Sequence, residues 1–499
     1  MKKLLTFILA FAMVCVLFAC AAKKNENPGV TTDPGTTTPE VTTPEITTPG
    51  TTEYVHKLPE KDYNGREYRV SGHDGYLKRE VFVPEESADA LDNAVWTRNQ
   101  IVQDQFDVII KPRFGATGSS IHTHANEVAG LIMSDVDELD IINTYICSIG
   151  PLVTQQLLLD WTQFEYTYLE GSWWTQTIND EFMLDGHLYT PVGSMNMTSL
   201  LYTMPVLMNK KLADTYKVYD EVIETIQDDA WTFDYFNSLI ERLGYQDVDD
   251  ENGPTEGDIY AFQGEGLTIL DMWQFAFDIP MLAHDDETVL KLAWGQGDYR
   301  EKLSNAVDMV LELYWENPGS IGHMGSGTHI NNFKADKGLF TMVRFLDVFN
   351  GVKDMDSTYT VLPWPKYDDS QEKYLCGMGD NFTQMCMPVT VPDSEFVSII
   401  TEALHMESEK VMWPVYYEDA LRTRYQDDPT SFEMLDLLME GRWADLGVPF
   451  NTNVGLSTMF RNVIRSKSNT ILTQIDGSVE TYNERVASIV TAYRESANN

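Results

Sequence analysis

The chain has 499 residues and a formal net charge of −42, with 77 acidic side chains against 35 basic ones. A surface of that sign repels nucleic acid and anionic lipid, and it disfavours polyanionic ligands outside a local basic pocket. A hydrophobic content of 43% and a length beyond one usual core predict a folded protein of two domains or lobes.

The first twenty residues have the parts of an export signal. Lys2 and Lys3 precede an apolar run, 4–18, that is too short for a comfortable transmembrane helix. The run ends in Leu-Phe-Ala-Cys, which resembles a lipobox, although Phe18 stands where a small residue is commoner. We therefore predict a signal peptide over 1–19 and a diacylglycerol-carrying Cys20 that anchors an exported protein to the outer face of the cell membrane. The alternative is an ordinary signal peptide that is cut nearby, with Cys20 incidental.

Residues 20–53 form a second segment, which is rich in threonine and proline. Its core reads TTDPGTTTPEVTTPEITTPGTTE, with Pro34, Pro39, Pro44 and Pro49 evenly spaced. Such a composition cannot bury apolar surface, so we expect a disordered and extended linker. In polyproline II form it could reach about 100 Å, which suits a globule held away from a membrane.

The first folded segment alternates strand and helix. REYRVSG (66–72), DVIIKPRF (107–114) and ELDIINTY (138–145) are strand-like, and helical patterns lie between them at 90–106 and near 121–134. This order predicts a mostly parallel α/β sheet, whose ligands would lie beyond the carboxyl ends of the strands. The apolar face expected for the helix 90–106 comprises Leu91, Ala94, Val95, Arg98, Ile101 and Val102.

The middle and the end of the chain are richer in helix. The stretch 210–226 is amphipathic, and WTFDYFNSLIERLG (231–244) has Thr232 as a helix N-cap and Gly244 as a stop. Its stripe of apolar residues is expected to be core packing. DIYAFQ (258–263) and STYTVLP (357–363) are strand-like, and 394–408 and 431–447 are predicted to be late amphipathic helices.

The cysteines and histidines show no clear site pattern. Cys147, Cys376 and Cys386 remain after the signal and the anchor, so a disulfide framework is not indicated. Cys376 and Cys386 are either two buried free thiols or a pair. His122 and His124 form a lone H-x-H, which we interpret as an exposed pair rather than a metal site.

Five stretches, taken together and in order, carry a resemblance to a known family. They are LDNAVWTRNQIVQDQFDVII, GHLYTPVGSMN with VLMNKKLA, DAWTFDYFNSLIERL, YTVLPWPKYDDSQEKY and YYEDALRTRYQDDPTSFEMLDLL. With the lipobox, they resemble extracellular solute-binding lipoproteins of carbohydrate-type ABC transporters, the family 1 proteins of Gram-positive bacteria. The resemblance covers 54–499.

The resemblance implies a two-lobed α/β fold of the periplasmic-binding-protein type II, whose lobes close on a ligand. Lobe I would comprise 54–192 and 376–410, and lobe II 196–375 and 411–499. The chain would cross near 191–198, 375–387 and 406–415. The implied partners are a small solute, a permease and a cytosolic ATPase, and we expect a monomer without a required cofactor.

The resemblance also implies where a sugar would be bound. Sugars need aromatic rings for their C–H faces and carboxylates, amides or arginine for their hydroxyls. Such residues occur in three places: the loops after the first and third strands, the stretches beside the crossings, and the crossings themselves. The candidates are His73, Asp74, Asn143, Tyr145, Trp173, Trp174, Asn196, Arg344, Phe345, Asp380 and Asn381. For each of them, core, cap or loop packing is the alternative.

Two departures from the family concern the type of sugar. The usual tyrosine before Asn-Lys is Met208 here, and no acidic residue is evident in the first crossing. Both departures argue against a pocket of the malto-oligosaccharide type.

The loop DVDDENGPTEGD (247–258) resembles a calcium loop. Asp247, Asp249 and Glu251 alternate, and Asp258 follows, which offers the oxygen ligands that hard cations prefer. Gly253 comes one residue later than an EF-hand loop allows. A structural calcium and a solvated acidic turn are the two interpretations.

The sequence therefore favours a non-catalytic protein that captures a sugar or oligosaccharide for an ABC importer. A surface glycan-binding or sensor protein with the same fold is one alternative. An exported glycan-active enzyme is the other, although the chain has no G-x-S-x-G, Walker A or zinc signature.

Overall fold

The computed structural model describes residues 57–73, 75, 80–115, 121–248, 253–286, 288–295, 297–325, 327–416 and 429–496. The predictions for the signal peptide, Cys20 and the linker therefore lie outside the described residues, as do those for Asp74, Asp249 and Glu251. Residues 55–499 form one compact unit. In the described part of the chain, no helix combines the length and the apolar character needed to cross a membrane.

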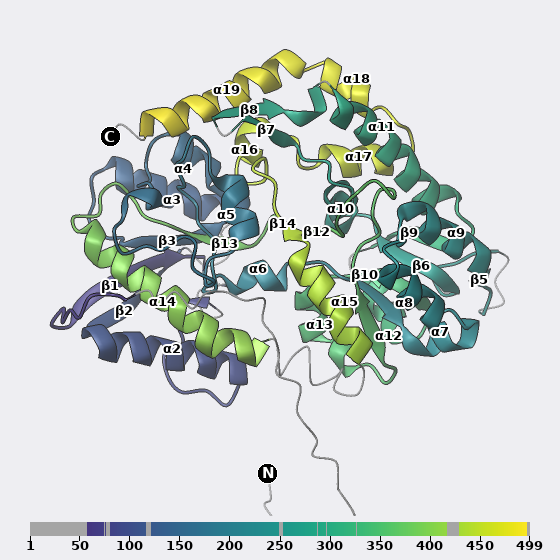
Figure 1. Ribbon diagram of the computed structural model, residues 1–499, viewed down its shortest axis with the longest axis horizontal. Coiled ribbons are helices and arrows are strands. Elements are labelled where there is room, and N and C mark those ends of the chain that lie inside the picture. Colours follow the sequence, from purple (N-terminus) through teal and green to yellow (C-terminus); the bar gives the residue numbers. More distant parts are fainter. Residues whose placement is uncertain are drawn as a thin grey trace, which may run out of the picture. The chain divides into compact units, whose positions relative to one another are not determined.

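The first sheet has the strand order β13-β3-β1-β2. β1 (Arg66–Gly72) pairs in parallel with both β2 (Val108–Phe114) and β3 (Ile141–Tyr145), while β13 (Thr383–Cys386) joins β3 in antiparallel orientation. Three helices flank it (Figure 1): α2 (Ala90–Phe106), α3 (Ile121–Met133) and α14 (Ser394–Pro414), of which α2 and α14 pack against each other. The predicted alternation of strand and helix is confirmed.

The α2 helix shows why this segment folds locally. The Asp89 carboxylate accepts hydrogen bonds from the backbone N–H groups of Leu91 and Asp92, and the helix stops at Asp107, which is left-handed with φ 45°. Ala94, Val95 and Val102 are buried as predicted. The prediction for Ile101 is wrong, because its side chain is 37% exposed at the edge of the apolar stripe.

The second sheet has the strand order β11-β4-β10-β6-β5, and β9 pairs with β6. β6 runs parallel to β9 and β10, whereas β4 is antiparallel to β10 and β11, and β5 to β6. The strands are β4 (Val206–Asn209), β5 (Tyr245–Gln246), β6 (Ile259–Glu265), β9 (Ser320–Met324), β10 (Gly338–Met342) and β11 (Tyr359–Leu362).

The helices around the second sheet follow local signals. In α9 (Phe233–Leu243), the Thr232 hydroxyl accepts a hydrogen bond from the Tyr235 N–H and Gly244 follows the last turn, as predicted. The stretch 210–226 forms two helices, α7 (Lys210–Tyr216) and α8 (Tyr219–Gln227), because Lys217 is left-handed. The others are α12 (Thr328–Lys334), α13 (Phe345–Asn350) and α15 (Pro429–Glu440).

The chain passes from the first sheet to the second between β3 and β4, and back between β11 and β13. The first passage contains α4 (Gly150–Thr154), α5 (Gln176–Phe182) and α6 (Met197–Leu201), and the second contains β12 (Cys376–Gly377), which pairs with β14 (Arg442–Trp443). The lobe boundaries stay a prediction.

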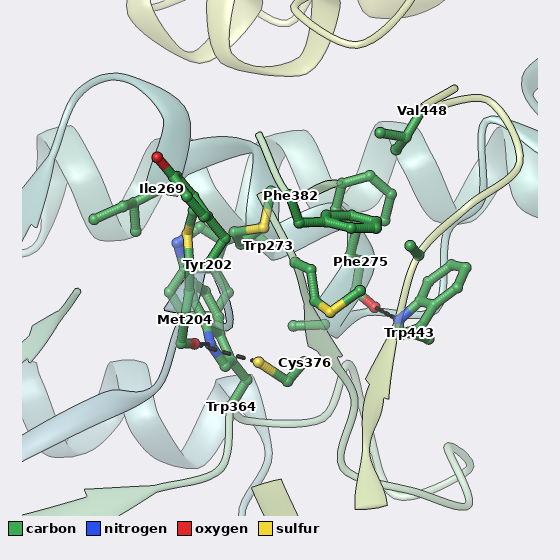
Figure 2. Packing of buried hydrophobic residues seen from close by; sticks show 14 of the residues in the cluster. Tyr202, Met204, Ile269, Trp273, Phe275, Trp364, Cys376, Phe382, Trp443 and Val448 are labelled. Atoms are coloured by element: carbon green, nitrogen blue, oxygen red, sulfur yellow. Dashed lines mark hydrogen bonds between the residues drawn. The ribbon is translucent and has the colours of Figure 1, made fainter. Parts of the chain in front are cut away.

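An aromatic core lies around the returning segment. Figure 2 shows Trp273, Trp364 and Phe275 packed beside Cys376, whose thiol donates to the Met204 carbonyl. The Trp443 indole N–H donates to the Phe275 carbonyl at 3.2 Å. Cys147, Cys376 and Cys386 are all buried free thiols, so Cys376 and Cys386 do not pair.

The remaining elements complete the unit. A short hairpin, β7 (Leu282–Asp286) and β8 (Val289–Leu292), contacts the last helix, which also contacts α4. The helices are α10 (Met272–Ala276), α11 (Asp298–Leu311), α16 (Asn451–Val454), α17 (Met459–Arg465), α18 (Ile471–Asp476) and α19 (Val479–Ser496). Two shorter turns that matter below are the 3₁₀ turn η3 (Thr268–Asp271) and the π-helical turn η5 (Glu312–Glu316). The α/β class is confirmed.

Candidate functional site

A hollow of about 360 Å³ lies at the carboxyl ends of the parallel strands β6 and β9. This is the edge at which open α/β sheets bind ligands. We call it the Trp315 hollow. Its lining residues are Gly266, Leu267, Leu270, Trp315, Gly322, His323, Met324, Gly325 and Arg465.

Trp315 supplies the main aromatic wall of the hollow. It sits on η5, a π-helical turn that follows α11, and such turns are frequent at functional sites. Its indole N–H donates to the Ile464 carbonyl at 2.9 Å, which fixes the ring against α17. The exposed His323 ring stacks on it, with ring centroids 4.9 Å apart and an interplanar angle of 22°. A side chain at Gly322 would overlap the Tyr314 ring, so bare backbone lies beside the two rings.

The charges at the hollow are positive. Its nine lining residues, all described, include Arg465 and His323 and no carboxylate. The Lys467 ammonium lies 3.6 Å from the centroid of the Trp315 ring, in a cation–π contact. The carboxylate at the end of β6, Glu265, is buried and accepts a hydrogen bond from the Ile269 N–H in η3.

A second and smaller cavity lies against η3. It measures about 20 Å³, which is room for one water-sized group, and Thr268, Asp271, Asp380 and Ser457 are among its lining residues. Burial raises the pKa of both Asp271 and Asp380, and Arg461 opposes that rise in each. Arg461 lies 3.2 Å from Asp271 through its guanidinium Nε. Two carboxyl groups therefore line this cavity, and one of them is paired with Arg461.

Asp380 and Asn381 were predicted from the second crossing. The Asn381 amide donates to an oxygen of Asp380 at 2.8 Å. Burial, and then the nearby carboxylate of Asp380, raise the pKa of the Cys147 thiol, which places Asp380 close to the residues that follow β3. The structure thus brings Asp380 between the end of β3 and the small cavity at η3.

At the carboxyl ends of β1 and β3, two of the predicted residues meet. The His73 and Tyr145 rings make an edge-to-face contact with centroids 5.4 Å apart, and Tyr145 is buried. Nearby, the interpretation of His122 and His124 as an exposed pair is wrong for His124. That ring is fully buried at hydrogen-bonding distance from the Ser71 and Thr144 hydroxyls, because α3 turns it inward toward β1 and β3.

A buried carboxylate, Glu80, connects the first sheet to both crossings. It accepts from the Asn143 amide at 3.0 Å, from the Thr198 N–H and hydroxyl, and from the Thr383 hydroxyl at 2.5 Å. The predicted ligand contact Asn196 belongs to the same cluster, since its amide donates to Thr383 at 3.2 Å. Burial raises the pKa of Glu80. These contacts favour a structural role for Asn143 and Asn196.

Trp173 and Trp174 are buried at 7% and 2% exposure. Both indole N–H groups donate to the Glu402 carboxylate on α14, at 2.8 and 3.0 Å. Both rings are therefore buried and both N–H groups are already hydrogen-bonded within the fold. This favours the packing alternative for this pair over a role in ligand binding.

Arg344 and Phe345 open α13, directly after β10. Arg344 makes a two-pronged ion pair with Asp347, with both N···O distances 2.8 Å, and its guanidinium lies 5.7 Å from the Tyr202 ring centroid. Phe345 is fully buried, so its ring packs in the core. Arg344 is half-buried and stays a candidate.

The calcium loop is described only in part. Both Asp258 oxygens accept backbone hydrogen bonds, from Val248 at 2.9 Å and Thr255 at 2.9 Å, and these lower the pKa of its carboxyl. Asp247 is exposed. Across the described ranges, no cluster of three or more metal-ligating side chains is present. Asp258 thus stabilises an acidic turn by accepting backbone hydrogen bonds within it. The bound calcium stays a prediction.

The sequence interpretation missed Trp315, His323 and Arg465. They come from three separate segments, and none of these carries a recognised motif. The signal that was available is the Trp-Glu-Asn-Pro-Gly break at 315–319, followed by the glycine-rich strand end at 322–327. Proline and glycine residues at these positions predict loops, but only the tertiary fold brings Arg465 next to them.

The fold is that of a solute-binding protein. It is similar to the crystal structure of an ABC transporter solute-binding protein from Thermotoga lettingae TMO, bound with α-D-tagatose, with a TM-score of 0.52 and 12% sequence identity. The match covers 85% of this chain and 100% of that chain. No protein-family model matches this chain, and no curated protein matches it.

Proposed function

We propose that the protein captures a sugar or oligosaccharide outside the cytoplasm and delivers it to an ABC importer, without catalysing a reaction. The observation that carries this proposal is the Trp315 hollow at the carboxyl ends of β6 and β9, in a chain with the fold of a solute-binding protein. An aromatic wall with an adjoining guanidinium matches the apolar face and the polar rim of a sugar.

Cleft closure is the proposed mechanism. A ligand shifts an open form to a closed form by its higher affinity for the closed one, and the closed form then docks on a permease. The three predicted crossings would act as the hinge, and Glu80 supports this because it bonds Thr198 in the first and Thr383 in the second.

The direct test is a thermal-shift screen of residues 55–499 against monosaccharides, oligosaccharides, amino acids and short peptides. A ligand that binds only the native state raises the melting temperature, and the rise grows with the logarithm of the ligand concentration relative to its Kd. A concentration-dependent rise with a sugar supports the proposal, and a rise confined to peptides or amino acids contradicts it. Cleavage of an oligosaccharide by the protein would instead support the enzyme alternative.

Replacing Trp315 with alanine is expected to weaken binding of the sugar found in that screen by about 5- to 30-fold, because the wall of the hollow loses the ring that holds His323 and Lys467 in place. Titration calorimetry measures the change. Trp96→Ala, on α2 beside the first sheet, is the matched control and should leave the affinity unchanged. Equal affinities for all three proteins would remove the Trp315 hollow from the proposed function.

The lipid anchor has its own test. A Cys20→Ala variant cannot carry diacylglycerol, so we expect nearly all of the protein in the medium or the soluble extracellular fraction. Stable anchoring needs more than one acyl chain, which is why loss of the diacyl group should suffice. Fractionation and immunoblotting measure this. Retention of the variant in the membrane fraction would mean that Cys20 is not the anchor.

A further inference from the structure

The Trp315 hollow is positively charged in a strongly acidic protein. The chain has more than two acidic residues for each basic one, and other arginines are paired, for example Arg242 with Glu221 and Arg494 with Asp185. Arg465, by contrast, is exposed at the rim of the hollow and has no ion-pair partner among the described residues. A cation in that position is available to a ligand.

A second cation lies beside the hollow, and an exposed imidazole adds a polar ring edge. Lys467 lies over Trp315, two residues beyond Arg465, and the exposed His323 ring stacks on Trp315. Two carboxylates near the hollow are engaged elsewhere. Glu265 is buried and bonded to the start of η3, and Asp271 is paired with Arg461. Among the nine residues that line the hollow, Arg465 is the one with a permanent charge.

We propose that the Trp315 hollow binds the anionic group of an acidic sugar, so that the captured solute carries a carboxylate or a sulfate. This rests on the proposed function of solute capture. Arginine binds carboxylate and sulfate oxygens through two parallel hydrogen bonds, which a neutral hydroxyl cannot match. The exposed His323 ring, which stacks on Trp315, supplies with Leu267 and Leu270 the apolar surface for the sugar's C–H face.

The size of the hollow agrees with this class of ligand. Its volume of about 360 Å³ lies at the lower end of the range for small-molecule sites, which fits one or two sugar rings rather than a polymer. A long polyanion is also disfavoured by the net charge of −42, which repels every part of it that extends beyond the hollow. The inferred ligand is thus a short acidic saccharide.

The test uses matched charged and uncharged probes on the full mature chain with Cys20→Ala. The probes are digalacturonate against its methyl ester, and N-acetylglucosamine 6-sulfate against N-acetylglucosamine. Titration calorimetry at low and at 0.5 M salt gives each affinity. We expect at least one charged probe to bind about tenfold more tightly than its neutral counterpart, with the difference shrinking at high salt.

Arg465→Met isolates the guanidinium, because methionine keeps an apolar stem without the charge. The variant should lose the preference for the charged probe while its affinity for the neutral probe stays within about twofold. Arg242→Met, whose partner is Glu221, is the control and should keep the preference. Circular dichroism of both variants reports whether each one is folded.

The remaining outcomes separate this inference from the proposed function. If a neutral sugar binds as tightly as its charged counterpart, or if Arg465→Met keeps the preference, the acidic-sugar inference is wrong and solute capture stands. If neither acidic sugars nor any neutral sugar in the thermal-shift screen binds, both are wrong. A preference seen only with the uronate or only with the sulfate supports the inference and names the anion.

Discussion

Replacing Glu80 with alanine is expected to lower the free energy of unfolding by about 3 to 5 kcal/mol. The substitution removes the carboxylate that accepts hydrogen bonds from Asn143, Thr198 and Thr383, and it leaves their donors buried without a partner. Each unsatisfied buried donor costs about 1 to 3 kcal/mol, and partial rearrangement reduces the sum. Urea unfolding of residues 55–499, followed by circular dichroism, measures the loss.

The neighbouring residue Glu85 provides the matched control. It lies five positions later, in the loop before α2, and is exposed, so Glu85→Ala should change stability by less than about 0.5 kcal/mol. Glu80→Gln should fall between the two, because an amide keeps one accepting oxygen and replaces the other with a donor. A loss below about 1 kcal/mol for Glu80→Ala would show that the cluster does not hold the crossings together.

Glu402 should make the protein less stable as the pH rises from about 4.5 to 7. Burial raises the pKa of its carboxyl from 4.5 to about 7, although the hydrogen bonds from Tyr168, Trp173 and Trp174 oppose this. The unfolded chain therefore releases this proton at lower pH than the folded protein does. The stabilisation is complete below pH 4.5, and about 3 kcal/mol of it is lost by the time the pH exceeds 7.

The measurement is the melting temperature of residues 55–499 across pH 4 to 8, compared with Glu402→Gln. The variant cannot titrate at this position. Its melting temperature should therefore fall less steeply between pH 4.5 and 7 than that of the wild type. Glu407→Gln lies on the same helix, where its carboxylate pairs with Lys410, and serves as the control. Parallel pH profiles for the wild type and Glu402→Gln would contradict the prediction.

Local patterns in the sequence were sufficient for much of the fold. The strands β1, β2 and β3 and the helices between them follow from hydrophobic periodicity, and Asp89 and Thr232 mark helix starts because their side chains accept backbone N–H groups a few residues on. These signals act over a few residues, so tertiary contacts change them little. Ile101 shows the limit of such patterns. Periodicity predicts it on the apolar face of α2, but in the fold it lies at the edge of that face and is 37% exposed.

The candidate site depends on contacts that local patterns do not contain. Trp173 and Trp174 look like sugar-stacking residues in the sequence, but Glu402, more than two hundred positions later, binds both indoles inside the fold. Arg465 becomes relevant only because α17 returns to the end of β9. Glu80 likewise shows no motif, since its three partners come from β3, the first crossing and β13.

The antiparallel strand β13 has a consequence for the order in which the molecule assembles. β3 ends at Tyr145, but its partner begins at Thr383, so one edge of the first sheet stays open until most of the chain has been made. Contacts this distant in sequence slow folding, because a long loop must close before they form. An emerging amino-terminal portion therefore remains incompletely folded during synthesis, which is the state in which a polypeptide can still be threaded through a narrow channel.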